Sequence, residues 1–165
     1  MRQTLFWIKG PWPGRLAIAA RPRGGDWLAD EVKAWKSAGV DVVVSTLEPD
    51  EAREFDLTSE AAESQKQGVD FVAIPIPDRQ TPPKGVENGL RALEERLREA
   101  RNVIVHCRQG IGRSAVIAAA LLILAGIDAE RAIKLVEEAR LRPVPETEEQ
   151  KDWLRRFAHA SSLVG

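Results

Sequence analysis

One stretch of the sequence gathers residues that could carry out a substitution at an anionic centre. Residues 103–114 read VIVHCRQGIGRS and join an apolar run to a helix-forming run that continues to residue 125. Cys107, the only cysteine of the chain, therefore lies where a strand leads into the N-terminus of a helix. The first amides of a helix have no partner within the helix, and together with the helix dipole they bind oxyanions. The same field favours the thiolate form of Cys107, which is the nucleophile.

The other residues of this loop suit attack on phosphorus. Gly110 and Gly112 allow the backbone to curl so that successive amides converge. Arg113 can bind two equatorial oxygens, and Ser114 can donate a hydrogen bond to the sulfur, which makes it a better leaving group in a second step. The amides expected to bind the phosphate belong to Arg108, Gln109, Gly110, Ile111, Gly112 and Arg113. The alternative is a buried structural cysteine beside a glycine turn, because cysteine is common in cores.

Phosphoryl transfer also needs a proton for the leaving oxygen, and Asp78 is the candidate general acid. It lies in a proline-rich stretch, IPIPDRQTPP at 74–83, that follows a strand-like run. Such a loop can cover a pocket and exclude water. The alternative is a turn-forming aspartate on the surface.

Both stretches resemble those of a known family. Residues 106–114 contain every fixed position of His-Cys-x5-Arg-Ser/Thr, the signature of cysteine-dependent protein tyrosine and dual-specificity phosphatases. The stretch around Asp78 is similar to the general-acid loop Pro-Ile-x-Asp-x-x-x-Pro of kinase-associated phosphatase, a compact form of that family. The order of elements resembles this compact form over about residues 39–157. The resemblance implies a phosphocysteine intermediate formed on Cys107.

The resemblance also suggests supporting residues. His106 matches the family's supporting histidine, and an imidazole there could hydrogen-bond the backbone of the turn, although a core histidine with satisfied hydrogen bonds is the alternative. Gln150 matches a glutamine that positions water in some members, although a surface helix glutamine is the alternative. Glu48 matches a glutamate that holds the signature arginine in some relatives, although charge complementing a helix dipole is the alternative.

Composition limits the other function classes. The 165 residues carry a net charge of −1, so no strong electrostatic argument exists for nucleic acid or membrane as a partner. A single cysteine excludes an internal disulfide and a cysteine-rich metal site, and a reactive thiol suits a reducing cytoplasm. We expect one dual-specificity-phosphatase-like catalytic domain over 1–165, a monomer that needs neither metal nor cofactor and binds a phosphorylated protein or peptide.

The pattern of elements predicts an α/β fold. Short β-branched or apolar runs alternate with amphipathic segments, which favours a central, mostly parallel sheet flanked by helices, similar to the phosphotyrosine protein phosphatase fold. Cys107 then lies at the carboxyl end of a strand, where such sheets bind ligands. The expected strands are 5–9, 16–20, 42–45, 69–76 and 103–105. The expected helices are 27–38 with Asp26 as N-cap, a short one from 48, and 58–68, 86–100, 115–125 and 146–159. Another helix is expected to follow Asp128 as its N-cap and to end at about residue 139.

Three alternatives to a protein phosphatase remain open. A phosphoinositide phosphatase is disfavoured because the Cys107 loop has no lysine to bind an inositol ring, as lipid phosphatases of the family have. A non-catalytic phosphoprotein-binding module is disfavoured because Cys107, Asp78 and Arg113 are all present. Sulfur transfer also uses a thiolate in a loop of amides, but the Asp78 loop favours phosphorus. The chain has no tyrosine, so the tyrosine that deepens the pocket of strict tyrosine phosphatases is absent.

Overall fold

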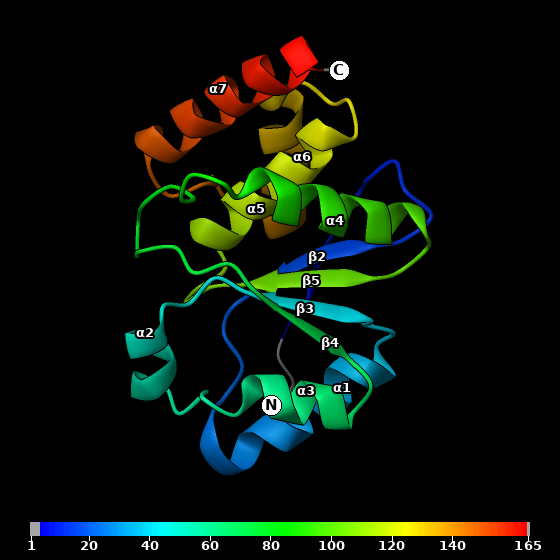
Figure 1. Cartoon of the computed structure of the whole chain (residues 1–165), viewed down its shortest axis with the longest axis vertical. Coiled ribbons are helices and arrows are strands. Elements are labelled where there is room, and N and C mark those ends of the chain that lie inside the picture. The colour runs from blue at the N-terminus through cyan, green and yellow to red at the C-terminus, as the bar shows by residue number, and fades with distance from the viewer. Residues whose placement is uncertain (1–3, 165) are drawn as a thin grey trace.

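A five-stranded sheet forms the centre of the protein, whose computed structural model describes residues 4–164 (Figure 1). Its strands lie in the order β1-β2-β5-β3-β4, and only β1 runs antiparallel to its neighbour. The sheet is therefore mostly parallel, as the alternation of elements predicts. The strands are β1 (Phe6–Ile8), β2 (Leu16–Ala19), β3 (Val42–Ser45), β4 (Asp70–Ala73) and β5 (Val103–His106).

Helices cover both faces of the sheet. In Figure 1, α4, α5, α6 and α7 lie on one side, and α1 and α3 lie on the other. The first group is α4 (Glu87–Arg98), α5 (Arg113–Leu124), α6 (Ala129–Arg140) and α7 (Glu148–Val164). The second is η1 (Gly25–Trp27), α1 (Leu28–Ser37), α2 (Pro49–Glu54) and α3 (Glu60–Lys66). This layering confirms the predicted α/β class.

The central strands are apolar on both faces because both faces are covered. Every residue of β2, β3 and β5 is buried. Side chains alternate across the sheet with a period of two, so Val103 and Val105 join the core beneath α5, and Ile104 joins the core beneath α1. The sheet is thus fixed in register by two separate apolar cores.

Helix α5 is the central helix of the larger core. Each of its residues except Leu124 is buried, including Arg113 and Ser114 in its first turn. The register of β5 places His106 beside Ala19 of β2 and Ser45 of β3. Cys107 therefore leaves the sheet at the shared carboxyl end of three parallel strands and leads directly into α5.

The structure corrects several predicted boundaries. Asp26 is not an N-cap, because the chain enters α1 through a 3-10 turn whose first amide, at Gly25, donates to the carbonyl of Asp56 (2.9 Å). Helix α5 begins two residues earlier than predicted. Strand β4 ends at Ala73, although Ile74 and Ile76 still donate to the carbonyls of residues 45 and 46. The prolines at 75 and 77 lack the amide that a regular ladder needs.

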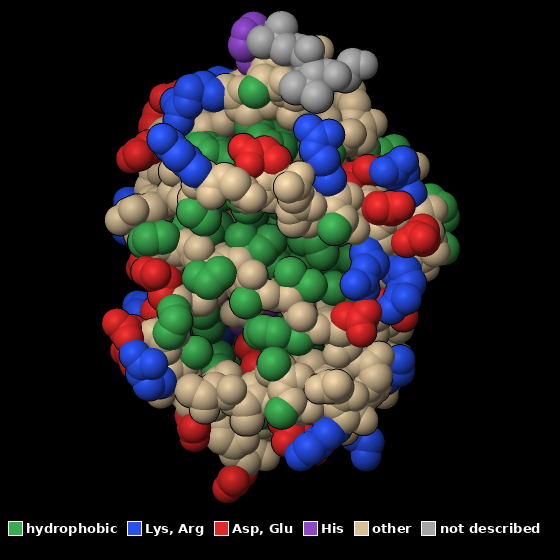
Figure 2. Space-filling view, viewed as in Figure 1, with side chains coloured by type: hydrophobic (Ala, Val, Ile, Leu, Met, Phe, Trp, Pro, Cys, Tyr) green, Lys and Arg blue, Asp and Glu red, His purple; other side chains and the backbone are tan. Residues whose placement is uncertain are grey.

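The surface shows no block of a single charge sign on the face in Figure 2. Apolar side chains gather in the middle of this face, and Lys, Arg, Asp and Glu are mixed around its edge. Among residues 4–164, no helix is both long enough and apolar enough to cross a bilayer.

Candidate active site

The loop of residues 107–113, called the Cys107 loop below, wraps around the sulfur of Cys107. The amide of Gly110 donates to Cys107 Sγ at 3.2 Å, and Ser114 Oγ lies 3.2 Å from the same sulfur. Gly110 has a φ of 74° and lies against the end of β2, where a Cβ would come within 2.9 Å of the Ala19 backbone. Only glycine fits here, for both conformation and space. The prediction is therefore confirmed for Gly110, whereas Gly112 has a φ of −113° and does not use the positive φ that glycine allows.

A small pocket of about 90 Å³ opens above the sulfur. The thiol itself is almost fully buried. The pocket is lined by Asp78, Cys107, Arg108, Gln109, Ile111, Gly112, Arg113 and Glu146. The structure thus brings the Cys107 loop and Asp78 together, although 29 residues (107 − 78) separate Cys107 from Asp78 in the sequence.

Arg113 is buried and held from several sides. Its Nη1 donates to Glu51 Oε1 (2.7 Å) and to the carbonyl oxygen of Ile76 (2.8 Å), and its Nη2 donates to Glu51 Oε2 (2.9 Å). Burial works to lower the pKa of Arg113, but the hydrogen bonds and charge of Glu51, with smaller contributions from Cys107 and Asp78, raise it above its ordinary value. Arg113 is therefore a permanent cation with a fixed orientation at the pocket.

Glu51, and not Glu48, holds Arg113. Glu48 is the N-cap of α2 and forms a capping box with Glu51, so its carboxylate serves the helix end, which is the second of the two roles expected for it. Burial works to raise the pKa of Glu51, but the hydrogen bonds and charge of Arg113, the Glu48 amide and Arg108 together lower it. The spacing of the two glutamates was visible in the sequence, but it does not reveal which one faces the pocket.

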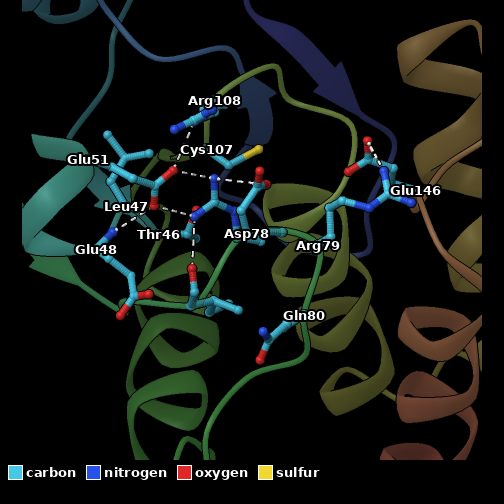
Figure 3. Close-up of polar contacts among 12 residues, drawn as sticks. Thr46, Leu47, Glu48, Glu51, Asp78, Arg79, Gln80, Cys107, Arg108 and Glu146 are labelled. Atoms are coloured by element: carbon cyan, nitrogen blue, oxygen red, sulfur yellow. Dashed lines mark hydrogen bonds and ion pairs between the residues drawn. The ribbon is translucent and has the colours of Figure 1, made fainter. Parts of the chain in front are cut away.

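The side chain of Arg108 points toward α2 (Figure 3). Its Nε donates to Glu51 Oε2 (3.0 Å), its Nη2 donates to Glu54 Oε2 (3.2 Å), and its guanidinium lies 5.0 Å from the centre of the Phe55 ring. Arg108 and Arg113 therefore share Glu51. Arg113, Glu51, Arg108 and Glu54 thus form one connected series of charges along the wall of the site, called the charge chain below. The sequence patterns did not predict it.

Asp78 lies at the predicted place. It follows residues 74–76, whose amides at positions 74 and 76 donate to the carbonyls of Ser45 and Thr46 at the end of β3. Its Oδ1 lies 3.4 Å from Arg113 Nη2, and half of its side chain is exposed. A carboxyl at the mouth of the pocket, next to the buried arginine, is in a position to exchange a proton with a bound group. The structure thus places Asp78 where the sequence predicts a general acid.

His106 is fully buried, and its ring lies on the far side of the sheet from the pocket wall formed by α5. His106 Nε2 is 2.7 Å from Glu60 Oε2, and the ring stacks on Trp35. Its Nδ1 has no hydrogen-bond partner among the described residues, so the expected bond from the imidazole to the turn's backbone is absent. Instead, Thr46 Oγ1 donates to the carbonyl of His106 (2.9 Å). Glu60 was not predicted from the sequence.

Gln150 is fully buried at the start of α7 and is not a surface residue. Its Nε2 donates to the carbonyl of Gln80 in the Asp78 loop (3.1 Å). Gln150 therefore lies beside the site and contacts the loop that carries Asp78, while its role in positioning water stays a prediction.

Arg140, at the end of α6, also reaches the site and was missed. Its Nε donates to the carbonyl of Gly110 (3.1 Å) and its Nη2 to that of Gln109 (3.4 Å). Burial and the charge of Arg142 lower the pKa of Arg140, while Cys107 acts in the opposite direction. The guanidinium thus stabilises the outer turn of the Cys107 loop. The described residues include no cluster of three or more His, Cys, Asp or Glu side chains that could hold a metal ion.

Comparison with solved structures supports the same fold. Kinase-associated phosphatase, solved with its catalytic-site cysteine replaced by serine, superposes with a TM-score of 0.86 at 20% identity, covering 98% of this chain and 97% of that one. The active form of Tk-PTP superposes with a TM-score of 0.74 at 31% identity, covering 88% and 92%. PTPMT1 in complex with PI(5)P superposes with a TM-score of 0.76 at 21% identity, covering 96% and 98%.

Sequence relatives and a family match complete the comparison. Protein tyrosine phosphatase type IVA 2 of Mus musculus is 33% identical over 91 residues, 53% of this chain and 54% of that protein. Type IVA 3 of Bos taurus is 34% identical over 116 residues, 68% and 62% of the two chains. The chain thus spans about half to three fifths of these relatives. Residues 3–164 match the family described as PTP-SAK, the Swiss Army Knife protein, DSP-PTPase phosphatase domain. The chain therefore belongs to this family of cysteine-dependent phosphatases.

Proposed function

We propose that the protein hydrolyses phosphate monoesters through a phosphocysteine intermediate on Cys107. The observation that supports this most directly is the shared pocket, in which a sulfur, a buried arginine and an accessible carboxyl meet within about 90 Å³. A pocket this small suits a compact group such as one phosphoryl group. The amides of residues 108–113 and the guanidinium of Arg113 are the phosphate ligands in this proposal.

In the first step, the Cys107 thiolate attacks phosphorus in line with the leaving oxygen. The sulfur–phosphorus bond forms as the phosphorus–oxygen bond of the ester breaks. The protonated carboxyl of Asp78 gives its proton to the leaving oxygen, which departs as a neutral alcohol or phenol. Arg113 stabilises the charge on the equatorial oxygens throughout.

In the second step, water attacks the phosphorus of the phosphocysteine. Asp78, now a carboxylate, accepts a proton from that water, and the sulfur–phosphorus bond breaks. Ser114 Oγ, 3.2 Å from Cys107 Sγ, donates to the departing thiolate and so makes it a better leaving group. Inorganic phosphate then leaves, and both groups return to their starting protonation.

The substrates we propose are phosphorylated proteins or peptides, with phosphoserine and phosphothreonine accepted beside phosphotyrosine. The pocket holds little more than the phosphoryl group, so an aromatic ring stays largely outside, and the site discriminates weakly between aryl and alkyl esters. A phosphoinositide is less well supported, because the Arg108 side chain is paired with Glu51 and Glu54 and is not free to bind an inositol ring.

The test is a phosphate-release screen on phosphotyrosine peptides, phosphothreonine peptides and phosphoinositide-containing vesicles. The wild type should release phosphate from the peptides in a vanadate-sensitive manner. Cys107→Ser should abolish turnover but retain binding of a phosphate ester. Turnover by Cys107→Ser at the wild-type rate would refute the mechanism. If the wild type showed no vanadate-sensitive turnover on any substrate, the protein would instead be a non-catalytic phosphoprotein-binding module. Thiosulfate-dependent conversion of cyanide would instead indicate sulfur transfer.

A further inference from the structure

Three consecutive residues of the Asp78 loop (residues 77–85) are held by three different partners. Asp78 Oδ1 lies 3.4 Å from Arg113 Nη2, and Arg79 Nη1 lies 2.9 Å from Glu146 Oε2. The carbonyl of Gln80 accepts from Gln150 Nε2 at 3.1 Å. Figure 3 shows Asp78 and Arg79 pointing to different sides of the loop. One side of the loop thus meets the pocket, and the other meets the start of α7.

The backbone of the loop explains this divergence. Arg79 has a φ of 64°, a left-handed conformation that is uncommon for a residue with a Cβ. The amide of Gln80 donates to the carbonyl of Pro77 at 3.0 Å and closes a tight turn around residues 78 and 79. An unfavourable conformation persists where contacts on both sides hold it. The partners of Arg79 and Gln80 are therefore the candidates for what holds Asp78 at the pocket.

Glu146 and Gln150 also lie next to the Cys107 loop. A Cβ added to Gly112 would lie 3.0 Å from Glu146 Oε1 and 3.5 Å from Gln150 Nε2, and Glu146 lines the same pocket as Gly112. The same two side chains are thus neighbours of the loop that carries the nucleophile and partners of the loop that carries Asp78. Gln150 is itself fixed, because its amide donates to Thr147 Oγ1 and its Oε1 accepts from the Thr147 amide, both at 3.1 Å.

We propose that Glu146 and Gln150 are positioning residues that hold the Asp78 loop closed over the pocket before substrate binds. This inference rests on the proposed function, in which Asp78 is the general acid. Glu146 acts through Arg79, and Gln150 acts through the Gln80 carbonyl. Neither residue transfers a proton in this proposal, and their effect on the rate passes entirely through the position of Asp78.

The charges of Arg79 and Glu146 predict that the two variants differ in their effect on KM but agree in their effect on proton transfer. Glu146 lines the pocket, where an unpaired carboxylate would repel a phosphate dianion. Arg79 neutralises it, so Arg79→Gln should raise KM for any phosphate ester. Glu146→Gln removes the carboxylate as well as the pairing, so it should leave KM unchanged or lower it. Both variants release the loop, so both should slow the step that needs the acid.

The test compares two substrates that differ in their need for a proton. The leaving group of phenyl phosphate needs protonation, whereas that of p-nitrophenyl phosphate is stable as an anion. The rate to measure is that of phosphocysteine formation in single turnovers at saturating substrate, because it excludes the second step, in which Asp78 acts as base for both substrates. Glu146→Gln and Arg79→Gln should each slow this step about three- to fivefold with phenyl phosphate, the range for a partly exposed ion pair. They should slow it less than about 1.5-fold with p-nitrophenyl phosphate. The double variant should lose no more than either single variant, because both remove the same contact.

The matched control is Glu148→Gln, which makes the same change on an exposed residue of the same helix start. It should alter neither substrate. Equal losses in the rate of phosphocysteine formation on both substrates, or no loss on phenyl phosphate, would overturn the positioning role. Gln150→Glu, which keeps the size of this buried side chain but removes its N–H donor, should show the same selective loss.

Hydrogen exchange supplies a measurement that does not depend on turnover. Amides in residues 76–85 should exchange faster in Glu146→Gln than in the wild type, while those of β5 stay unchanged. Unchanged exchange in the loop would refute the proposal that the Arg79–Glu146 ion pair holds the loop closed, even if the protein showed no turnover. If the loop exchanges faster but Asp78→Asn loses no activity on phenyl phosphate, Glu146 holds the loop but Asp78 is not the general acid.

Discussion

Replacing Glu51 with glutamine tests the charge chain at the site, because it removes the charge and preserves the shape. Glu51 accepts two hydrogen bonds from Arg113 and one from Arg108, and only a tenth of its side chain is exposed. The amide of glutamine keeps one acceptor oxygen but turns an N–H group toward a guanidinium. Each carboxylate oxygen accepts two hydrogen bonds, so two of the four are lost whichever oxygen is replaced, while Arg113 retains the carbonyl of Ile76.

The expected cost of Glu51→Gln is about 3 kcal/mol of unfolding free energy at neutral pH. Breaking a buried ion pair by removing one partner costs about 3–5 kcal/mol. The lower end applies because Ile76 and Asp78 still face Arg113. Urea unfolding followed by tryptophan fluorescence measures this difference. Steady-state kinetics should also show kcat/KM falling by about ten- to a hundredfold, because Arg113 is no longer oriented.

The loss of unfolding free energy caused by Glu51→Gln should become smaller as pH falls. The native pKa of Glu51 is lowered, so its contribution to stability is fully present above its ordinary pKa of about 4.3 and is lost as pH falls through the lower native value. The difference between wild type and Glu51→Gln should therefore shrink at about pH 3. Glu54→Gln, an exposed partner of Arg108 alone, should cost less than about 0.5 kcal/mol. An equal deficit at both pH values, or none at neutral pH, would refute the reasoning.

Three further predictions concern single positions. Ser114→Ala should slow breakdown of the phosphocysteine more than its formation, so rapid-quench kinetics should show a larger burst; an unchanged burst would contradict the role of the hydroxyl. Glu48→Ala should cost about 1 kcal/mol of stability through the lost cap and leave kcat unaltered, and a large fall in kcat would restore Glu48 to the site. Gly110→Ala should impair both folding and activity, because its Cβ would meet the Ala19 backbone at 2.9 Å; a fully active, stable variant would be inconsistent with the loop geometry.

Local patterns were enough to predict the sheet and the two loops that end at the pocket. The runs at β3 and β5 are short, β-branched and apolar, and their burial on both faces leaves few other structures open to them. Asp128 was predicted as an N-cap, and it accepts from the Arg131 amide at 2.8 Å at the start of α6. Each of these predictions depends on residues that are close in sequence.

The partners of the site residues could not be predicted, because they depend on packing between distant segments. Glu51 reaches Arg113 across 62 positions, and Glu60 reaches His106 across 46. Glu48 and Glu51 lie one helical turn apart and are chemically alike, so only the orientation of α2 decides which one meets the arginine. A glutamate that pairs with a distant residue leaves no periodic signal in a single sequence.

Glu51, Ile76 and Arg113 belong to segments that follow three different strands, β3, β4 and β5, yet they meet at one guanidinium. That junction joins segments that are far apart in the chain, so it is lost whenever any one of the three segments detaches. A site assembled in this way cannot stay intact when the protein is partly unfolded. During thermal inactivation, loss of turnover should accompany or precede the first opening of the sheet's carboxyl edge.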